Sequence, residues 1–293
     1  MAARKQAAAP KAAEPETPAG AVEDWSNTTS TAVVNYEEEM ARQAEEAAKM
    51  ERNAGGAQFF SVRGGQLTFD DMPVPGNQMA VVILASILEN VYYPDAFDPE
   101  NPTPPMCYAF GKDEAEMAPH EDVVLLAQAQ NETCHGCPMN AWASADKGRG
   151  KACRNTRRLA VMAAGTIDQA TNQFTPFKDV DQFKSGPIGY LKLPVTSVAG
   201  YATFVKSVAG ALKRPPHGIF TRIRVVPDPK TQFRVLFEPM TEVPSGLLGT
   251  VMARHKEAES SIDFPYSLEQ PVKKEEKPSA GKAAAKRTRG SKY

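Results

Sequence analysis

The sequence predicts an α+β fold that is rich in β-strands. Short apolar or alternating stretches recur along the chain, Gly- or Pro-rich turns separate several of them, and only a few stretches have the spacing of an amphipathic helix. Strands this short and numerous can close into a β-barrel of the oligonucleotide-binding type. We therefore expect such a barrel-like core, with a few helices, an inserted loop that carries four cysteines, and disordered tails.

Composition separates two tails from the body of the chain. Residues 1–33 are rich in Ala, Pro, Glu and Thr, and residues 268–293 are rich in Lys, Ala, Glu and Pro. Segments with so few large apolar residues bury too little surface to fold, so we expect both tails to be disordered. The strand-rich core is expected at residues 57–267, with the cysteine-bearing and basic loop at 107–158.

An acidic arm precedes the core at residues 34–56. Asn35 can cap a helix over residues 36–52, which is rich in Glu, Ala, Met and Lys and is stopped by Gly55 and Gly56. Because apolar residues are few in this helix, we expect a solvated or partner-binding arm rather than a core element.

The core begins with a predicted β-hairpin. Residues 59–62 and 66–69 have strand composition, and Gly64 and Gly65 can make the turn between them. Residues 79–85 are continuously apolar, which fits either a buried strand or the start of a buried helix. Further strands are expected at 106–110, 190–195, 219–226 and 232–237, of which the last two form a second hairpin.

Two helices are expected in the C-terminal half. Residues 197–213 carry apolar side chains at helical spacing, with Ser197 as the cap. Residues 241–260 also have a helical pattern, with Pro244 in the first turn. Residues 98–105 contain four prolines and must be irregular.

The four cysteines are the most informative residues of the chain: Cys107, Cys134, Cys137 and Cys153. Cys134 and Cys137 form a Cys-x-x-Cys knuckle, in which Gly136 relaxes the turn. Cys107 lies 27 residues before the knuckle and Cys153 lies 16 residues after it. Four soft thiolates in this arrangement favour a closed, structural Zn²⁺ site, which leaves no position for a reactive water.

Other interpretations of the cysteines stay open. The four thiols could hold an iron–sulfur cluster, or they could be unligated. Cys107, beside Tyr108 and Phe110, could also be a buried core residue, in which case only the three cysteines downstream of it cluster. If Cys107 does not reach the metal, His135 and His120 are the fallback ligands.

The last cysteine lies in the most basic run of the core. Six cations and no acid occur within twelve residues: Lys147, Arg149, Lys151, Arg154, Arg157 and Arg158. Gly148 and Gly150 let the backbone approach a ligand, and Arg binds phosphate through a two-pronged contact. Aromatic side chains that could stack on bases are Trp142, Tyr92, Tyr93, Phe59 and Phe60.

Cations combined with stacking rings are typical of proteins that bind single-stranded nucleic acid without sequence preference. A solvated loop is the alternative for the basic run, and Trp142 could instead cover the zinc site.

Two further basic segments could contact the same ligand. Arg222, Arg224 and Arg234 alternate with apolar residues, and Lys230 lies in the turn between them, which predicts a basic outward sheet face or an ordinary solvent face. The segment 272–293 carries eight Lys or Arg against two Glu, a net charge of +6. It would add salt-sensitive phosphate affinity, or it would serve solubility alone.

Charge and motifs exclude several classes of function. The whole chain has a net charge of −1, and residues 34–271 carry about −6, so anion binding must come from a local patch. The chain has no phosphate-loop, Rossmann, Gly-x-Ser-x-Gly or His-Glu-x-x-His motif, so we expect no enzyme. A Mg²⁺-dependent nuclease is a minor alternative on three acidic pairs: Asp70–Asp71, Glu121–Asp122 and Asp179–Asp181.

Neither a signal peptide nor a run of the about 18 apolar residues that a membrane span needs is visible. We therefore expect a soluble, cytoplasmic protein. In a reducing compartment, four cysteines favour a metal site or free thiols over disulfides.

Several short stretches carry a resemblance to a known family: Asn90–Pro94, Pro104–Gly111, Cys134–Trp142, Gly148–Cys153 with Arg157–Ala160, and Leu193–Ser197. Over about residues 58–240 the chain resembles bacteriophage single-stranded DNA-binding proteins, most specifically in its cysteine segment. The resemblance implies a zinc element, an oligonucleotide-binding-like core, a role in DNA replication or recombination, and the host-cell cytoplasm as location.

The C-terminal tail departs from bacterial-type single-strand binders, whose tails are acidic and recruit partners. This tail is basic, so only the acidic arm, with Glu37–Glu39 and Glu45–Glu46, could recruit replication or recombination proteins.

The expected function is therefore non-enzymatic, sequence-tolerant binding of single-stranded DNA, with zinc as a structural element. The alternative is a zinc-stabilised structural, scaffold or regulatory protein that binds other proteins through the helix at 36–52.

Overall fold

The computed structural model describes five residues of the arm and most of the core: Tyr36, Glu39, Met40, Arg42 and Gln43, then residues 58–70, 72–95 and 103–266. Residues 1–56 and 57–293 are two separate compact units. The five described arm residues are helical. The predicted tails at 1–33 and 268–293, and the rest of the arm, lie outside the described residues.

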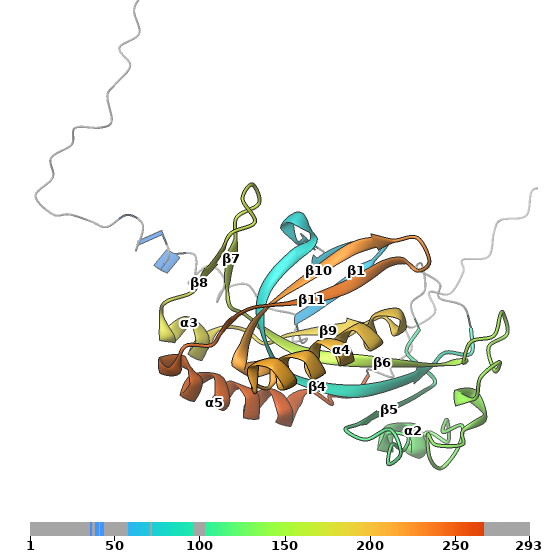
Figure 1. Ribbon diagram of the computed structural model, residues 1–293. Helices are drawn as coiled ribbons and strands as arrows, with labels where there is room; N and C mark the ends of the chain where they lie inside the picture. The colour runs from blue at the N-terminus through green and yellow to red at the C-terminus, as the bar shows by residue number, and fades with distance from the viewer. Residues whose placement is uncertain are drawn as a thin grey trace, which may run out of the picture. The chain divides into compact units, whose positions relative to one another are not determined.

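The core is organised by one curled sheet of nine strands (Figure 1). The spatial order is β11 (Gln232–Glu242), β10 (Ile219–Asp228), β4 (Gln78–Tyr92), β6 (Cys153–Ala163), β9 (Gly189–Leu193), β1 (Gln58–Arg63), β2 (Gln66–Phe69) and β3 (Met72–Pro73). β5 (Cys107–Gly111) pairs with the second half of β4. All pairs in this sheet are antiparallel except β1 with β9. A separate two-stranded hairpin contains β7 (Gly165–Ile167) and β8 (Phe174–Pro176).

The central strand β4 explains why the sheet is buried on both faces. Its residues 79–85, whose pattern also fitted a helix, are strand and almost fully buried. Its pairing with β6 shifts register between Ile83 and Ala85, which reverses the side to which the following side chains point. After this bulge Ser86, Leu88, Asn90 and Tyr92 share one face, and Ile87, Glu89, Val91 and Tyr93 share the other.

Helices cover both faces of the sheet (Figure 1). On one face α4 (Val195–Leu212) packs Tyr201, Phe204 and Val208 against Ile83 and Leu159. On the other face α5 (Ser245–Ser261) and α3 (Val180–Ser185) pack against residues such as Leu84 and Met162. The strands are therefore apolar on both sides.

The cysteine segment forms a small lobe at the end of the sheet where β5 and β6 begin. The lobe contains α2 (Glu121–Leu125) and the short 3₁₀ helix η2 (Pro138–Asn140), joined by turns. His120 caps α2 by accepting the Asp122 backbone N–H at 3.3 Å. The lobe has small cores of its own, around Val91 and Tyr108 and around Met117 and Cys134.

The strand-rich α+β class is confirmed, and so are both hairpins. Gly64 and Gly65 adopt φ values of 56° and 80°, which explains why the first turn needs glycine. The described strands follow an open path from β11 to β3, so a closed barrel of the oligonucleotide-binding type is not shown.

Two helix starts differ from the prediction. α4 begins at Val195, after Pro194, and Ser197 does not cap it: the Ser197 hydroxyl is buried and accepts the Val235 N–H at 3.0 Å. α5 begins at Ser245 rather than 241, because β11 continues to Glu242.

Among the described helices, α4 is long and apolar enough to cross a membrane by length and composition. Tyr201, Phe204 and Val208 of this helix pack in the core, and a core helix of this kind passes the same test of length and composition.

Candidate functional site

A groove of about 600 Å³ opens where β1, β4, β6 and β9 meet. Its lining includes Val91 from β4 and Tyr93 directly after this strand, and Arg154 and Thr156 from β6. The chemically important lining residues are Phe59, Arg63, Tyr93, Arg154, Lys192 and Phe233. Asp95 is the one carboxylate among the lining residues. The groove therefore combines cations with aromatic rings.

The rings of the groove are positioned by other aromatics. Phe59 is 43% exposed, and its ring packs against Phe264 at 5.6 Å and Tyr190 at 6.2 Å between centroids. The Arg154 guanidinium lies over the Tyr93 ring at 5.6 Å, although Arg154 itself is exposed. One face of Phe59 and the cation of Arg154 are thus presented to the same hollow.

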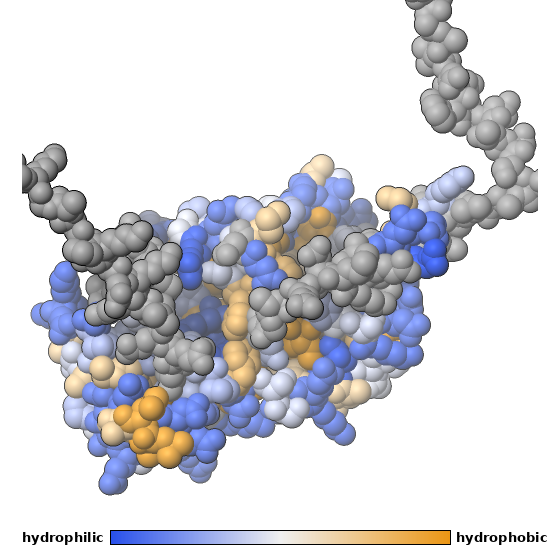
Figure 2. Space-filling model, turned by 180° about the vertical axis from the view of Figure 1, so that it is seen from behind, coloured by the Kyte–Doolittle hydropathy of each residue, from blue (hydrophilic) through white to orange (hydrophobic). Residues whose placement is uncertain are grey.

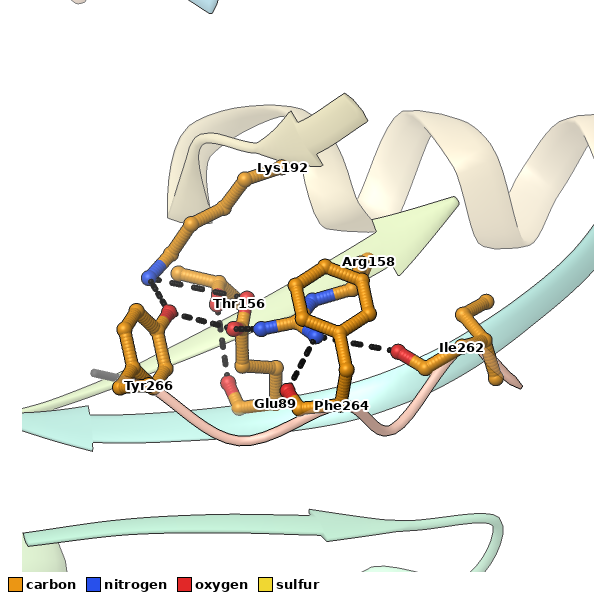
Figure 3. Close-up of polar contacts among 7 residues, drawn as sticks. All are labelled: Glu89, Thr156, Arg158, Lys192, Ile262, Phe264 and Tyr266. Carbon is orange, nitrogen blue, oxygen red and sulfur yellow. Dashed lines mark hydrogen bonds and ion pairs between the residues drawn. The ribbon is translucent and has the colours of Figure 1, made fainter. Parts of the chain in front are cut away.

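Lys192 enters the groove from a buried charge network (Figure 3). The centre of the network is Glu89, which is fully buried. Its carboxylate accepts hydrogen bonds from Arg158 Nη2 at 2.7 Å and Tyr266 Oη at 2.5 Å. Thr156 Oγ1 donates at 3.2 Å, and Lys192 Nζ lies 3.6 Å away. Lys192 also donates to Tyr266 Oη at 2.7 Å, so its ammonium is fixed at the groove wall.

The charges of this network stabilise one another. Burial alone would raise the pKa of Glu89, but Lys192, Arg158 and the hydrogen bond from Tyr266 outweigh it, so the pKa lies below its ordinary value. Burial lowers the pKa of Lys192, and Glu89 opposes that effect. Burial and Glu89 raise the pKa of Tyr266, which keeps its hydroxyl a donor.

Arg158 does not belong to the basic surface that the sequence predicted. It is 3% exposed, and its guanidinium donates to the backbone oxygens of Ile262 (3.0 Å) and Phe264 (2.9 Å) as well as to Glu89. The rings of Phe110 and Phe264 lie 4.4 Å and 4.1 Å from it. The cation is fully engaged inside the protein, so it is not a nucleic-acid contact.

The predicted basic loop also ends earlier than expected. Residues from Cys153 onward are strand, so successive side chains point to opposite faces. Arg154 therefore reaches the groove, whereas Arg157 points to the α4 side. There Arg157 donates to Ser86 Oγ at 3.1 Å and lies 5.6 Å from the Tyr201 ring.

The remaining residues of the loop lie on the surface of the cysteine lobe. Trp142 is 78% exposed, and Lys151 Nζ lies 5.6 Å from its ring while donating to Asn140 Oδ1 at 3.1 Å. Lys147 and Arg149 are exposed. These four residues form a second cationic and aromatic surface, separate from the lining of the groove.

The predicted basic face of the second hairpin carries acids of its own. Arg224 and Arg222 both approach Glu238, at 2.5 Å and 3.8 Å. Arg234 lies 3.7 Å from Asp228. Lys230 is exposed in the turn. None of these residues lines the groove, and the pairing reduces their net positive charge.

The four cysteines converge on one cavity of about 20 Å³, which has room for about one water-sized particle. Cys107 and Cys153 come from β5 and β6, and both pair in register with Tyr92 of β4. The knuckle supplies the other two. Neither predicted fallback ligand, His120 or His135, is among the residues that line this cavity.

The thiols are close without forming a finished metal site. Within the described residues, no three His, Cys, Asp or Glu side chains are grouped closely enough to hold a metal ion. Burial and the neighbouring thiols raise the pKa of Cys153 to about 12, and burial raises the pKa of Cys107 and Cys134. The donor set suits a soft cation, but the side chains would have to close on it.

The acidic pairs considered for a nuclease are dispersed. Asp71 lies outside the described residues, and Asp70 is exposed. Asp122 accepts a hydrogen bond from Tyr108, and Asp179 caps α3.

None of the family models, curated proteins or solved structures compared with the chain matches it. The site is therefore interpreted from its own geometry. The sequence-based prediction included Arg154, Tyr93 and Phe59 but missed Arg63, Lys192 and Phe233. Lys192 is a single cation between apolar strand residues, and no local sequence signal distinguishes it from a lysine that simply faces solvent.

Proposed function

We propose that this chain is a non-enzymatic single-stranded DNA-binding protein that holds the strand in the groove between β1 and the ends of β4, β6 and β9. The observation that carries the proposal is the alternation of cations and rings in one hollow, with Arg154 and Lys192 beside Phe59 and Tyr93. Phosphates would contact the cations and bases would stack on the rings, a mode that tolerates any sequence.

The surface of Trp142, Lys147, Arg149 and Lys151 is proposed as a second contact for the same strand. Its ring and cations have the same chemistry as the groove; Trp142, Lys147 and Arg149 are exposed, and Lys151 is half-buried. The basic segment 272–293 would add non-specific affinity. The function fits a phage replication or recombination system in the host cytoplasm, as the sequence resemblance implies, with replication or recombination proteins as partners.

Two parts of the proposal concern the scaffold. The four cysteines would hold a structural Zn²⁺, which is supported by their shared cavity and soft donor set. An oligonucleotide-binding-type core is supported only by the curled, strand-rich sheet.

The decisive experiment is a salt titration of binding to a fluorescent oligo-dT, measured by anisotropy. Binding is expected to weaken linearly with log salt, with a slope of about 0.7 per phosphate contact. Arg154→Ala is expected to reduce both affinity and slope. Lys206→Ala removes one charge from the exposed side of α4 and serves as the matched control. No binding at low salt would refute the proposal. A parallel series with oligo-U tests the preference between DNA and RNA.

A second function is favoured by one observation. Val124, Leu125 and Leu126 are consecutive and 56%, 82% and 53% exposed, and Figure 2 shows an apolar patch over α2. Exposed apolar runs of this kind mark protein-binding surfaces. If the chain is instead a zinc-stabilised scaffold or regulatory protein, Leu125→Glu would abolish association with its protein partner while the groove variants would have no effect.

A further inference from the structure

The thiol cavity and the groove lie on opposite faces of the same strand ends. Tyr92, the last residue of β4, lines the cavity, and Tyr93, directly after the strand, lines the groove. On β6, Cys153 lines the cavity, and the next residue, Arg154, lines the groove. Because side chains alternate along a strand, a movement of the backbone here displaces both sites together.

An ion in the cavity would connect two strands, β5 and β6, with the knuckle. Cys107 and Cys153 both pair with Tyr92, so they lie on one face with β4 between them. Two strand spacings separate their Cα atoms by about 10 Å, which is beyond the reach of a disulfide. The knuckle thiols Cys134 and Cys137 line the same cavity. An ion held by all four thiols would therefore draw the ends of β5 and β6 towards each other.

Only one wall of the groove depends on these strand ends. Lys192 is fixed by Tyr266 and the buried Glu89, and Phe59 is packed against Phe264. Arg154 and Tyr93, in contrast, contact each other at the point where β4 ends and β6 begins. If the four thiols closed on an ion, the position of Arg154 and Tyr93 relative to Lys192 would change.

We propose that metal binding by the thiol cluster and strand binding in the groove are coupled, so that a soft divalent cation such as Zn²⁺ raises the affinity of the groove for single-stranded DNA. The inference rests on the proposed function and adds its regulation. Coupling between two binding sites is reciprocal, so the bound strand raises the affinity of the thiols for Zn²⁺ by the same factor.

The test compares the full chain loaded with Zn²⁺, depleted by a chelator under reducing conditions, and reloaded. Anisotropy with oligo-dT is expected to show affinity about 5- to 150-fold weaker in the depleted chain, the usual range of such coupling, with recovery on reloading. Zn²⁺ affinity, measured by competition with a chromophoric chelator, is expected to increase by the same factor when unlabelled oligo-dT is present.

Three variants separate coupling from simple loss of either site. Arg154→Ala is expected to keep its Zn²⁺ affinity but to lose most of the response of that affinity to DNA. Phe59→Ala, on the wall that does not depend on the cavity, is expected to bind DNA more weakly and yet to keep the full response to Zn²⁺. Cys137→Ser is expected to have the DNA affinity of the depleted chain and no response to metal.

Circular dichroism measures whether each form is folded. If Cys137→Ser is unfolded, the comparison uses only the depleted and reloaded unmodified chain. Equal DNA affinity in the folded, depleted and loaded chains would overturn the coupling, and so would a chain that binds no Zn²⁺. A loaded chain that binds no single-stranded nucleic acid would overturn the proposed function itself.

Discussion

Replacing Arg158 by Met is expected to lower the free energy of unfolding by about 3–5 kcal/mol. The change leaves the fully buried carboxylate of Glu89 without its 2.7 Å partner, and the nearest remaining cation, Lys192, lies 3.6 Å away. The backbone oxygens of Ile262 and Phe264 also lose a donor. Met fills much of the space between the two rings, so the loss reports the charge and hydrogen bonds more than a cavity.

A double variant distinguishes an unpaired buried charge from lost packing. Arg158→Met with Glu89→Leu removes both partners, and apolar replacement of a whole buried pair is commonly neutral or stabilising. We expect it to recover at least half of the loss. Unfolding in urea is followed by circular dichroism. A loss below about 1 kcal/mol in the single variant, or a double variant no more stable than the single, would refute the reasoning.

Three further predictions concern pH, backbone space and base stacking. The folded chain holds the pKa of Glu89 below its ordinary value, so the ionised carboxylate stabilises the fold at pH values above about 4.3. This stabilisation is lost as the pH falls through the folded pKa. The urea midpoint of the unmodified chain should therefore fall more steeply on acidification than the midpoint of Arg158→Met. Gly165→Ala places a Cβ 2.2 Å from the Thr175 backbone oxygen and is expected to lower the thermal midpoint. Gly210→Ala has open space around it in α4 and is expected to raise the free energy of unfolding by about 0.5–1 kcal/mol. Equal effects of the two variants would contradict the geometry. Phe59→Ala is expected to cost about 1–3 kcal/mol of single-strand affinity with little change in salt slope, and a changed slope with unchanged affinity would argue against stacking.

The sequence predicted the parts of the fold that depend on local chemistry. The hairpin turn at Gly64 and Gly65, the strand at Cys107 and the helix ended by Lys213 each follow from residues next to one another. The length of β4 was underestimated, because Ser86, Glu89 and Asn90 interrupt the apolar signal of its second half.

The candidate site was predictable only in pieces. The dense charge of residues 147–158 suggested one exposed loop, but pairing with β4 divides its last cations between two faces of a sheet. Arg158 is buried with Glu89, which lies diagonally across from it on the neighbouring strand β4, and no local pattern reveals a partner so distant in the chain. The knuckle is visible in sequence, whereas the pairing of Tyr92 with two cysteines is not.

The parallel pairing of β1 with β9 has a consequence for the order of folding. Gln58 lies beside Gly189, so β1, which pairs early with β2, waits for its second partner until much later in synthesis. Contacts between such distant segments carry a large loop-closure entropy and form late. In a nascent chain, β4, β5 and β6 with their cysteines would therefore assemble first. The pairing of β1 with β9, which completes the side of the groove that carries Phe59, would form last. Ligand binding in the groove would then report on completed chains only.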